Sequence, residues 1–363
     1  MPDPKIVTVL EPEDEYTHEP DPVSNYNESM YLNGFDLERE LGAWFRIGNR
    51  VNEGYAEMTV CIYLPDGRVG FIYGRPEISN NNEMRAGGLE IKVETPFERL
   101  TVDYDGKVCL LDEPRQMANP RVAFRDNPFV DCSVHLDVTG VSPMYGGMPQ
   151  YEDGSPLKTD STKSFAKAHY EQHTAVVGTI QVGTETIALD GLGLRDKSWG
   201  PRYWQALRWY RWLPMIFGPD FAMMLSIVDR DGTPARSGMV LTDGEYSLIR
   251  DCTIESEWDS EHYQTAMRAW AATDDNEYEI VGRVLSMIPL RNRRTTDDGQ
   301  QLHTRITEAM TRYECNGRVG MGMSEYLDQI VDGRPIGTDM RLEAERIDLN
   351  IAAAQRGRGP SGP

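Results

Sequence analysis

The sequence predicts an all-β protein made of two consecutive antiparallel domains of the sandwich or barrel type. Short runs of β-branched and aromatic residues recur along the chain, separated by turn sequences such as Asp66-Gly67 and Asn316-Gly317. Asp-Gly and Asn-Gly supply the positive backbone angles of tight hairpin turns, so neighbouring runs are expected to pair as antiparallel strands. At 363 residues the chain exceeds the size of one ordinary core, which favours two domains.

Hairpin signals continue along the chain, with expected turns at residues 65–68, 105–106, 229–232, 243–244, 274–277 and 316–317. Helical pattern is thin: residues 258–270 and 341–355 could be helical, and the second segment fits a closing strand equally well. Because sandwiches and barrels are the all-β architectures that deal with open sheet edges, each domain is expected to take one of these forms.

We expect four segments along the chain: an acidic, extended lead-in over residues 1–25, an N-terminal β domain over 26–165, a C-terminal β domain over 166–351 and a disordered tail over 352–363. The least patterned region, residues 112–130 and 141–168, is rich in Pro, Gly, Asn and Asp. The domain boundary is placed in its second part, near residue 165.

Charge and cysteine content narrow the partners. The chain has 37 basic and 58 acidic side chains, a net charge of -21 that repels phosphate backbones, so we expect no nucleic-acid partner. The most apolar stretch, residues 212–228, is broken by Pro214, Gly218, Pro219 and Asp220, so we expect no stable membrane insertion. Five scattered cysteines without a CxxC motif, and an N-terminus without a signal-peptide pattern, predict a cytoplasmic protein with reduced thiols. A homodimer is left open.

The densest group of chemically versatile residues spans residues 193–204, with Trp212 shortly after it. It contains Asp196, Lys197, Trp199, Arg202, Tyr203 and Trp204. Tryptophans beside charged groups suit the wall of an apolar ligand cavity. The alternative is a structural Arg–Asp pair beneath a packed tryptophan core.

A second polar group spans residues 169–173. On a strand, His169, Glu171 and His173 would share one face. A carboxyl buried against an apolar wall has a raised pKa and can act as a general acid near neutral pH. Two alternatives are a zinc or iron site and a solvent-facing polar edge; our prediction includes no metal.

A third group lies near the C-terminal end of the patterned region. Gly320 and Gly322 would share one strand face and make room for a neighbour or a ligand, with Glu325 and Tyr326 following. The chain has no nucleophile elbow, phosphate loop, HExxH motif or dinucleotide-binding fingerprint. Any catalysis is therefore expected to be acid–base work or shape-based, without a cofactor.

Residues 196–200, Asp-Lys-Ser-Trp-Gly, followed by Pro201-Arg202 and Trp204, resemble the Asp-His-x-Trp-Gly signature of the hydroxyneurosporene synthase (carotenoid 1,2-hydratase)-like, or AttH-like, group. The resemblance extends from about residue 25 to 350. It implies two lipocalin-like β domains around a lipophilic ligand. It also implies an acid near the motif that protonates an alkene and a Trp, here Trp199, that stabilises the cation. Two departures stand out: Lys197 replaces the signature His, and Asp229 stands where the hydratases have Tyr-x-Asp.

Together these features predict a cofactor-independent enzyme acting on a terpenoid, steroid-like or polyene alkene by hydration, isomerisation or cyclisation, in a cavity at the domain interface. The predicted catalytic residues are Asp196, Glu171, Lys197, Trp199 and Asp229. The predicted substrate-binding residues are His169, Arg202, Tyr203, Trp204, Trp212, Glu325 and Tyr326. The alternatives are a pericyclase-like template, which only preorganises a polyene, and a non-catalytic carrier of a lipophilic small molecule.

Overall fold

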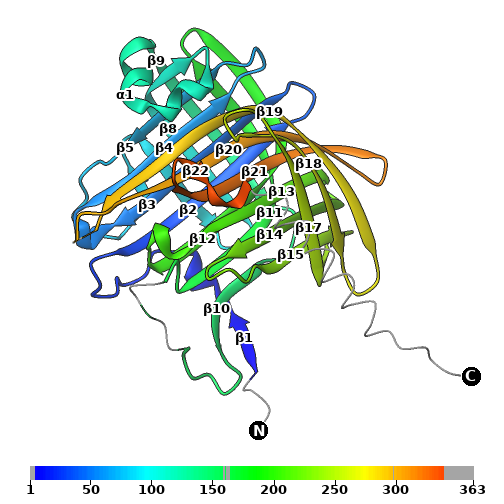
Figure 1. Cartoon of the computed structure of the whole chain (residues 1–363). Helices are drawn as coiled ribbons and strands as arrows, with labels where there is room; N and C mark the ends of the chain where they lie inside the picture. Colours follow the sequence, from blue (N-terminus) through cyan, green and yellow to red (C-terminus); the bar gives the residue numbers. More distant parts are fainter. Residues whose placement is uncertain (1–4, 158–159, 161–163, 297, 339–363) are drawn as a thin grey trace, which may run out of the picture.

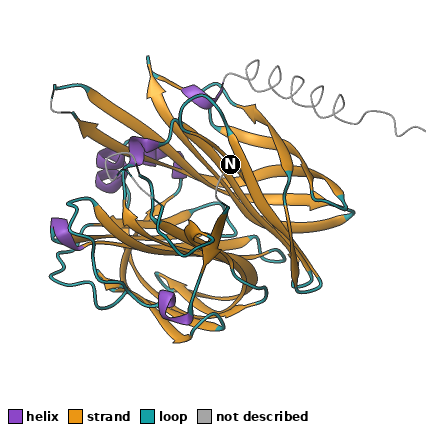
Figure 2. Cartoon of the chain, turned by 90° about the horizontal axis from the view of Figure 1, so that it is seen from below, coloured by secondary structure: helices purple, strands orange, loops and turns teal. Residues whose placement is uncertain are grey.

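The computed structural model describes residues 5–157, 160, 164–296 and 298–338. Two large antiparallel sheets make up most of the structure (Figures 1 and 2). Hairpin turns and a few short helical turns connect their strands. The predicted all-β, antiparallel fold class is confirmed. Within the described ranges, no helix has the length and apolarity needed to cross a membrane.

The first sheet contains twelve strands, eight of which close into a ring. β9 pairs with both β8 and β11, so the order β11-β12-β2-β3-β4-β5-β8-β9 returns to its start. The strands are β1 (Ile6–Val9), β2 (Tyr26–Asp36), β3 (Leu41–Arg50), β4 (Tyr55–Tyr63), β5 (Val69–Gly74), β6 (Arg85–Ala86), β7 (Leu89–Thr95), β8 (Arg99–Leu111), β9 (Phe129–Gly140), β10 (Tyr145–Tyr151), β11 (Ala168–Val182) and β12 (Glu185–Pro201).

Alternation along the strands separates the inside of this ring from its outside. On β2, Met30 and Leu32 belong to the apolar core inside the ring, whereas Tyr31 between them belongs to a different cluster outside it. The ring thus has its own core and presents a second, largely aromatic face outward.

The second sheet contains ten strands, with the order β16-β15-β14-β13-β21-β20-β19-β18-β17 and β22 paired to β21. They are β13 (Trp209–Gly218), β14 (Phe221–Asp229), β15 (Ala235–Thr242), β16 (Glu245–Leu248), β17 (Asp251–Trp258), β18 (Gln264–Ala272), β19 (Glu277–Thr295), β20 (Gln301–Cys315), β21 (Arg318–Val331) and β22 (Arg334–Pro335). One face covers its own core, which includes Leu213, Leu225 and Ile254. The helical turns are η1 (Pro12–Glu15), η2 (Val51–Glu53), η3 (Pro114–Ala118), α1 (Pro120–Asp126), η4 (Trp204–Ala206) and η5 (Ile336–Thr338).

The two sheets share a third apolar cluster. Tyr31 and Trp44 from the first sheet pack with Trp212, Met310 and Met323 from the second. The outer face of the ring is therefore covered by the second sheet. The five cysteines of the chain are all free and buried.

Two local expectations are wrong. Residues 105–106 lie within the continuous strand β8, where Gly106 makes room for the side chain of Tyr104 instead of forming a turn. Residues 258–270 contain the end of β17 and most of β18, not a helix. The other predicted turns join consecutive strands.

The expected boundary near residue 165 does not coincide with the change of sheet. β11 and β12 pair with β9 and β2 of the first sheet, and the second sheet begins only at β13. The irregular stretch before β11 is a long connection within the first sheet. Residues 341–355 and the tail at 352–363 lie outside the described residues.

Candidate active site

A cavity of about 670 Å³ lies between the outer face of the ring and the second sheet. Its volume falls within the range of sites that bind a small organic ligand. The aromatic part of its wall comes from both sheets and includes Tyr31, Trp44, Tyr210 and Trp212.

The first wall follows one row of cross-strand neighbours. Glu171 on β11 lies opposite Asp196 on β12, which lies opposite Tyr31 on β2 and then Arg46 on β3. Residues at matched positions of adjacent strands point to the same face, so all four side chains line the cavity.

The second wall follows a corresponding row. Trp212 on β13 lies opposite Glu325 on β21, which lies opposite Glu308 on β20. The Trp212 indole Nε1 donates a 2.8 Å hydrogen bond to Glu171 Oε1 and so joins the two walls.

Glu171 is the most distinctive group of the first wall. Its side chain is buried, and its second oxygen, Oε2, has no hydrogen-bond partner. Burial raises the pKa of Glu171 to about 7, although the nearby His169 charge and the Trp212 hydrogen bond oppose the rise. At neutral pH the carboxyl is therefore divided between its acid and its base form.

His169 and Asp196 form a pair beside Glu171. His169 Nε2 lies 3.0 Å from Asp196 Oδ2 and 3.6 Å from Glu171 Oε1. Burial alone would lower the pKa of His169, but the adjacent Asp196 carboxylate outweighs it and raises the pKa to about 9. His169 is then a cation at neutral pH and favours the carboxylate form of its neighbour. His173, on the same strand, instead contacts the Tyr246 hydroxyl at 2.9 Å across the two sheets.

His169, Glu171 and Asp196 each place one donor atom within 4.8 Å of the others, a spacing at which a metal ion could be held. His169 already contacts Asp196, and Glu171 already accepts the Trp212 hydrogen bond. We therefore interpret the three as a hydrogen-bonded acid–base group.

Two carboxyls face each other directly on the second wall. Burial raises the pKa of Glu308 well above its usual range, with the Glu325 charge adding to the effect. Burial also raises the pKa of Glu325 to about 7, although Tyr210 donates a hydrogen bond to it. Like charges directly opposite one another destabilise a sheet, so the Glu325 charge favours the protonated form of Glu308.

The cavity therefore contains seven residues that the sequence predicts for the site: His169, Glu171, Asp196, Arg202, Trp204, Trp212 and Glu325. The sequence-based site does not include Glu308, Arg46, Tyr31 or Tyr210. The signal for Glu308 is a carboxylate between two apolar residues, Ile306 and Met310, on one face of its strand.

Lys197 and Trp199 do not line the cavity, because they alternate with Asp196 and Ser198 and point to the other face of β12. The Lys197 ammonium donates to Glu28 Oε1 at 2.7 Å and to the backbone oxygens of Asp14 and Tyr16. Their predicted catalytic roles therefore do not fit their positions.

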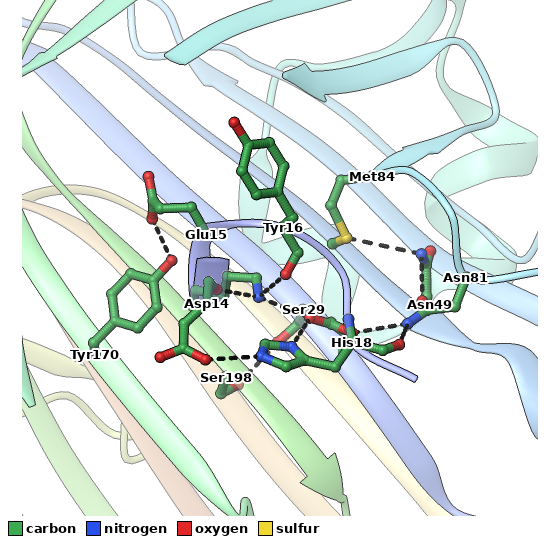
Figure 3. Close-up of polar contacts among 12 residues, drawn as sticks. Asp14, Glu15, Tyr16, His18, Ser29, Asn49, Asn81, Met84, Tyr170 and Ser198 are labelled. Atoms are coloured by element: carbon green, nitrogen blue, oxygen red, sulfur yellow. Dashed lines mark hydrogen bonds and ion pairs between the residues drawn. The ribbon is translucent and has the colours of Figure 1, made fainter. Parts of the chain in front are cut away.

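The lead-in lies on that other face and includes the strand β1 and the helical turn η1. β1 pairs with β10, and η1 brings Glu15 against Arg195 and Tyr170, as Figure 3 shows for Tyr170. The His18 ring stacks on Trp199 with 4.1 Å between centroids. The Trp199 face that was predicted to stabilise a cation is thus covered by the protein itself.

Three more predicted residues lie away from the cavity. Asp229 ends β14, accepts a hydrogen bond from the Gly232 backbone N–H and contacts Arg208, as a hairpin residue does. Tyr326 is buried in the second sheet and contacts Ser256. The guanidinium of Arg294 lies 4.7 Å from the centre of the Tyr203 ring.

The family model described as a domain of unknown function, DUF7064, matches residues 11–330. The chain belongs to the DUF7064 family. Among curated proteins, none matches this DUF7064 sequence.

Three solved structures are similar to this DUF7064 chain. An AttH candidate from Nitrosomonas europaea has 14% identity and a TM-score of 0.57, over 90% of this chain and 97% of its own. Kievitone hydratase from Nectria haematococca has 9% identity and a TM-score of 0.50, over 85% and 90%. CghA, crystallised with Sch210972, has 10% identity and a TM-score of 0.48, over 84% and 89%. The likeness to the Nitrosomonas europaea structure shows that the DUF7064 chain has the same lipocalin-like fold, with two large antiparallel sheets. The narrower resemblance to hydroxyneurosporene synthase stays a prediction.

Proposed function

We propose that the cavity is the active site of an enzyme that hydrates, isomerises or cyclises a lipophilic alkene by acid catalysis, with Glu171 as the acid. The observation that carries this proposal is the Glu171 carboxyl, which is buried, has one unpartnered oxygen and titrates near neutrality at the wall of an aromatic cavity. Kievitone hydratase, a hydratase by name, has the same fold. A terpenoid, steroid-like or polyene substrate fits the aromatic wall.

The proposed first step is a proton transfer from Glu171 to an alkene carbon. The π electrons of the alkene form the new C–H bond, and the neighbouring carbon becomes a cation. The faces of Tyr31 and Trp212, whose ring centres lie 5.7 Å apart, can attract that cation. Glu171 becomes a carboxylate facing the charged His169 ring.

The second step returns the proton to Glu171. In a hydration, water attacks the cation and gives up one proton to the Glu171 carboxylate. In an isomerisation, the carboxylate takes the proton from a carbon next to the cation. In a cyclisation, a second double bond attacks the cation first, and the proton is lost afterwards. One group therefore serves as acid and then as base.

His169 and Asp196 act as positioning residues in this scheme. Asp196 holds the His169 ring at 3.0 Å and keeps it charged. The charge is placed to stabilise the Glu171 carboxylate that the first step generates.

The test is an incubation of the purified protein with terpenoid, steroid and polyene alkenes in heavy water, read by mass spectrometry. Wild-type protein should give a product that is heavier by one heavy water, or an isomer with one carbon-bound deuterium. Glu171→Gln should lower turnover by at least about 100-fold while ligand affinity is kept. Glu185→Gln, at an exposed position on β12, is the matched control.

Each other result points elsewhere. Full activity of Glu171→Gln would reject Glu171 as the acid. A cyclised product without deuterium would indicate a pericyclase-like template, and tight binding without any product would indicate a carrier. Loss of activity on chelation, restored by a metal ion, would replace the acid–base interpretation of His169, Glu171 and Asp196 with a metal site.

A further inference from the structure

Arg202 is a buried cation that forms no ion pair with any acid in the described part of the chain. Its residue is 8% exposed, and it lines the cavity. Its Nη2 donates a 2.6 Å hydrogen bond to the Ser198 hydroxyl, and its Nε has no hydrogen-bond partner. Burial and the nearby charge of Arg46 lower the pKa of Arg202 to about 10, so the guanidinium still carries its charge at neutral pH.

The other buried basic side chains show how unusual this is. In the ranges that the structure describes, Lys197 is paired with Glu28, Arg195 with Glu15, Arg211 with Asp328 and Arg50 with Glu53. A buried charge without a counter-ion is costly. The chain has a net charge of -21, so acidic residues are abundant. The missing ion pair at Arg202 is therefore not explained by a lack of acidic residues in the chain.

Arg46 lies beside Arg202 and is also incompletely satisfied. The guanidinium carbons of Arg202 and Arg46 lie 5.4 and 5.8 Å from the centre of the same Trp204 ring. Arg46 Nη1 donates to Glu57 at 3.1 Å, but its buried Nη2 has no partner. The Phe165 ring covers Arg202 from another side, 4.0 Å from its guanidinium carbon.

The acids that line the cavity act on Arg202 and Arg46 over longer distances, and among the described residues only Glu57 forms an ion pair, with Arg46. Asp196, the acid of the first wall nearest in sequence, forms its ion pair with His169. Glu325 accepts a hydrogen bond from Tyr210. No described residue satisfies these unpartnered nitrogen atoms of Arg202 and Arg46, which leaves them for a group of a bound ligand.

We propose that this group is a carboxylate of the ligand, held by Arg202 and Arg46, so that the substrate is a lipophilic carboxylate. The proposal rests on the function proposed above and names its substrate class. Arginine forms charge-assisted, often bidentate hydrogen bonds with carboxylates. An anion bound between two arginines also offsets the repulsion between their positive charges. The carboxylate anchors one end of the ligand while the apolar part packs against Tyr31 and Trp212, within reach of Glu171.

The experiment compares the binding of cis-parinaric acid with that of its methyl ester. The fluorescence of both probes rises when they enter an apolar cavity. The two probes share the same chain and differ in the charge of one end. Wild-type protein should bind the acid at least about ten-fold more tightly than the ester. Arg202→Gln should remove this preference by weakening acid binding alone, and Arg46→Gln should reduce it.

Arg250→Gln serves as the matched control, because Arg250 is an exposed residue just before β17 and is paired with Asp274. It should keep the full preference. If Arg202→Gln does not fold, as judged by circular dichroism, Arg46→Gln and Arg202→Lys carry the test, and the lysine variant should retain part of the preference.

The failures of the two proposals are distinguishable. Equal binding of acid and ester by wild-type protein, or a preference that survives both Arg202→Gln and Arg46→Gln, would overturn the carboxylate proposal and leave the enzyme proposal standing. If the enzyme turned over neutral alkenes as fast as the corresponding carboxylic acids, the carboxylate proposal would be overturned and the enzyme proposal would stand. Binding of neither probe would overturn it together with the lipophilic cavity on which it rests.

Discussion

At the residue scale, the chemistry of the cavity centres on Glu171. Its carboxyl combines an unpartnered oxygen, a hydrogen bond from Trp212 and a nearby charged imidazole. Burial favours the protonated form, whereas the other two favour the carboxylate. Because these influences nearly balance at neutral pH, small changes around Glu171 are expected to shift both stability and activity.

The first prediction concerns stability. A carboxyl whose pKa is about 7 when folded and about 4.5 when unfolded contributes stability below pH 4.5 that is lost as pH rises through 7. Glutamine mimics the protonated form, so Glu171→Gln should be more stable than wild type, by a margin that grows by about 1–2 kcal/mol from pH 5.5 to 8. Urea unfolding at the two pH values measures this, and a margin independent of pH would contradict it.

The second prediction concerns the pH dependence of activity. The Trp212 N–H stabilises the Glu171 carboxylate, so Trp212→Phe should raise the pKa of Glu171. Since the acid form is active, the fall of kcat/KM with rising pH should move upward by roughly half a pH unit to one unit. Trp270→Phe, on a strand that does not line the cavity, is the control. An unshifted profile would mean that another group sets the pH limit.

At the scale of elements, β12 serves two different surfaces through simple alternation. Asp196 and Ser198 face the cavity, whereas Arg195, Lys197 and Trp199 hold the lead-in. The lead-in is therefore part of the folded domain. Its Glu15 accepts hydrogen bonds from Arg195 at 2.7 and 2.9 Å and one from the Phe97 backbone.

The third prediction tests that element. Glu15→Ala leaves Arg195 buried and unpaired, so it should lower the free energy of unfolding by about 3–5 kcal/mol. Glu13→Ala, on the exposed side of η1, should change it by less than about 0.5 kcal/mol. Urea denaturation followed by circular dichroism gives both values. Similar small losses in the two variants would show that the lead-in contributes little to the fold.

At the scale of the whole molecule, the two sheets are held together by a shared core and by hydrogen bonds between side chains. The Tyr63 hydroxyl donates to the Glu308 backbone oxygen at 2.9 Å, and Tyr246 contacts Ser142 and His173. Neither sheet can leave the other without exposing Tyr31, Trp44 and Trp212 to water. The cavity exists only while both walls are in place.

The fourth prediction is that the described domains unfold as one unit. Far-ultraviolet circular dichroism, which reports the strands, and tryptophan fluorescence, which weights the interface, should give coincident denaturant transitions. Tyr246→Phe removes the hydroxyl that links β16 to β11 and should move both transitions together by about 1 kcal/mol. Two separate transitions would show that the sheets are independent.

Local patterns in the sequence determined the all-β class, most of the hairpins and much of the cavity wall. Turn chemistry at Asn316-Gly317 acts between neighbouring residues, so it can be read without the fold. The same is true of the alternation that places His169 and Glu171 on one face.

Only the tertiary structure decided which surfaces those faces meet. It brought Trp212 against Glu171, assigned β11 and β12 to the first sheet and covered Trp199 with His18. Strand pairing across long stretches of chain is governed by packing among distant segments, which no local pattern encodes. The face of β12 that does chemistry therefore becomes known only when both the second sheet and the lead-in are in place.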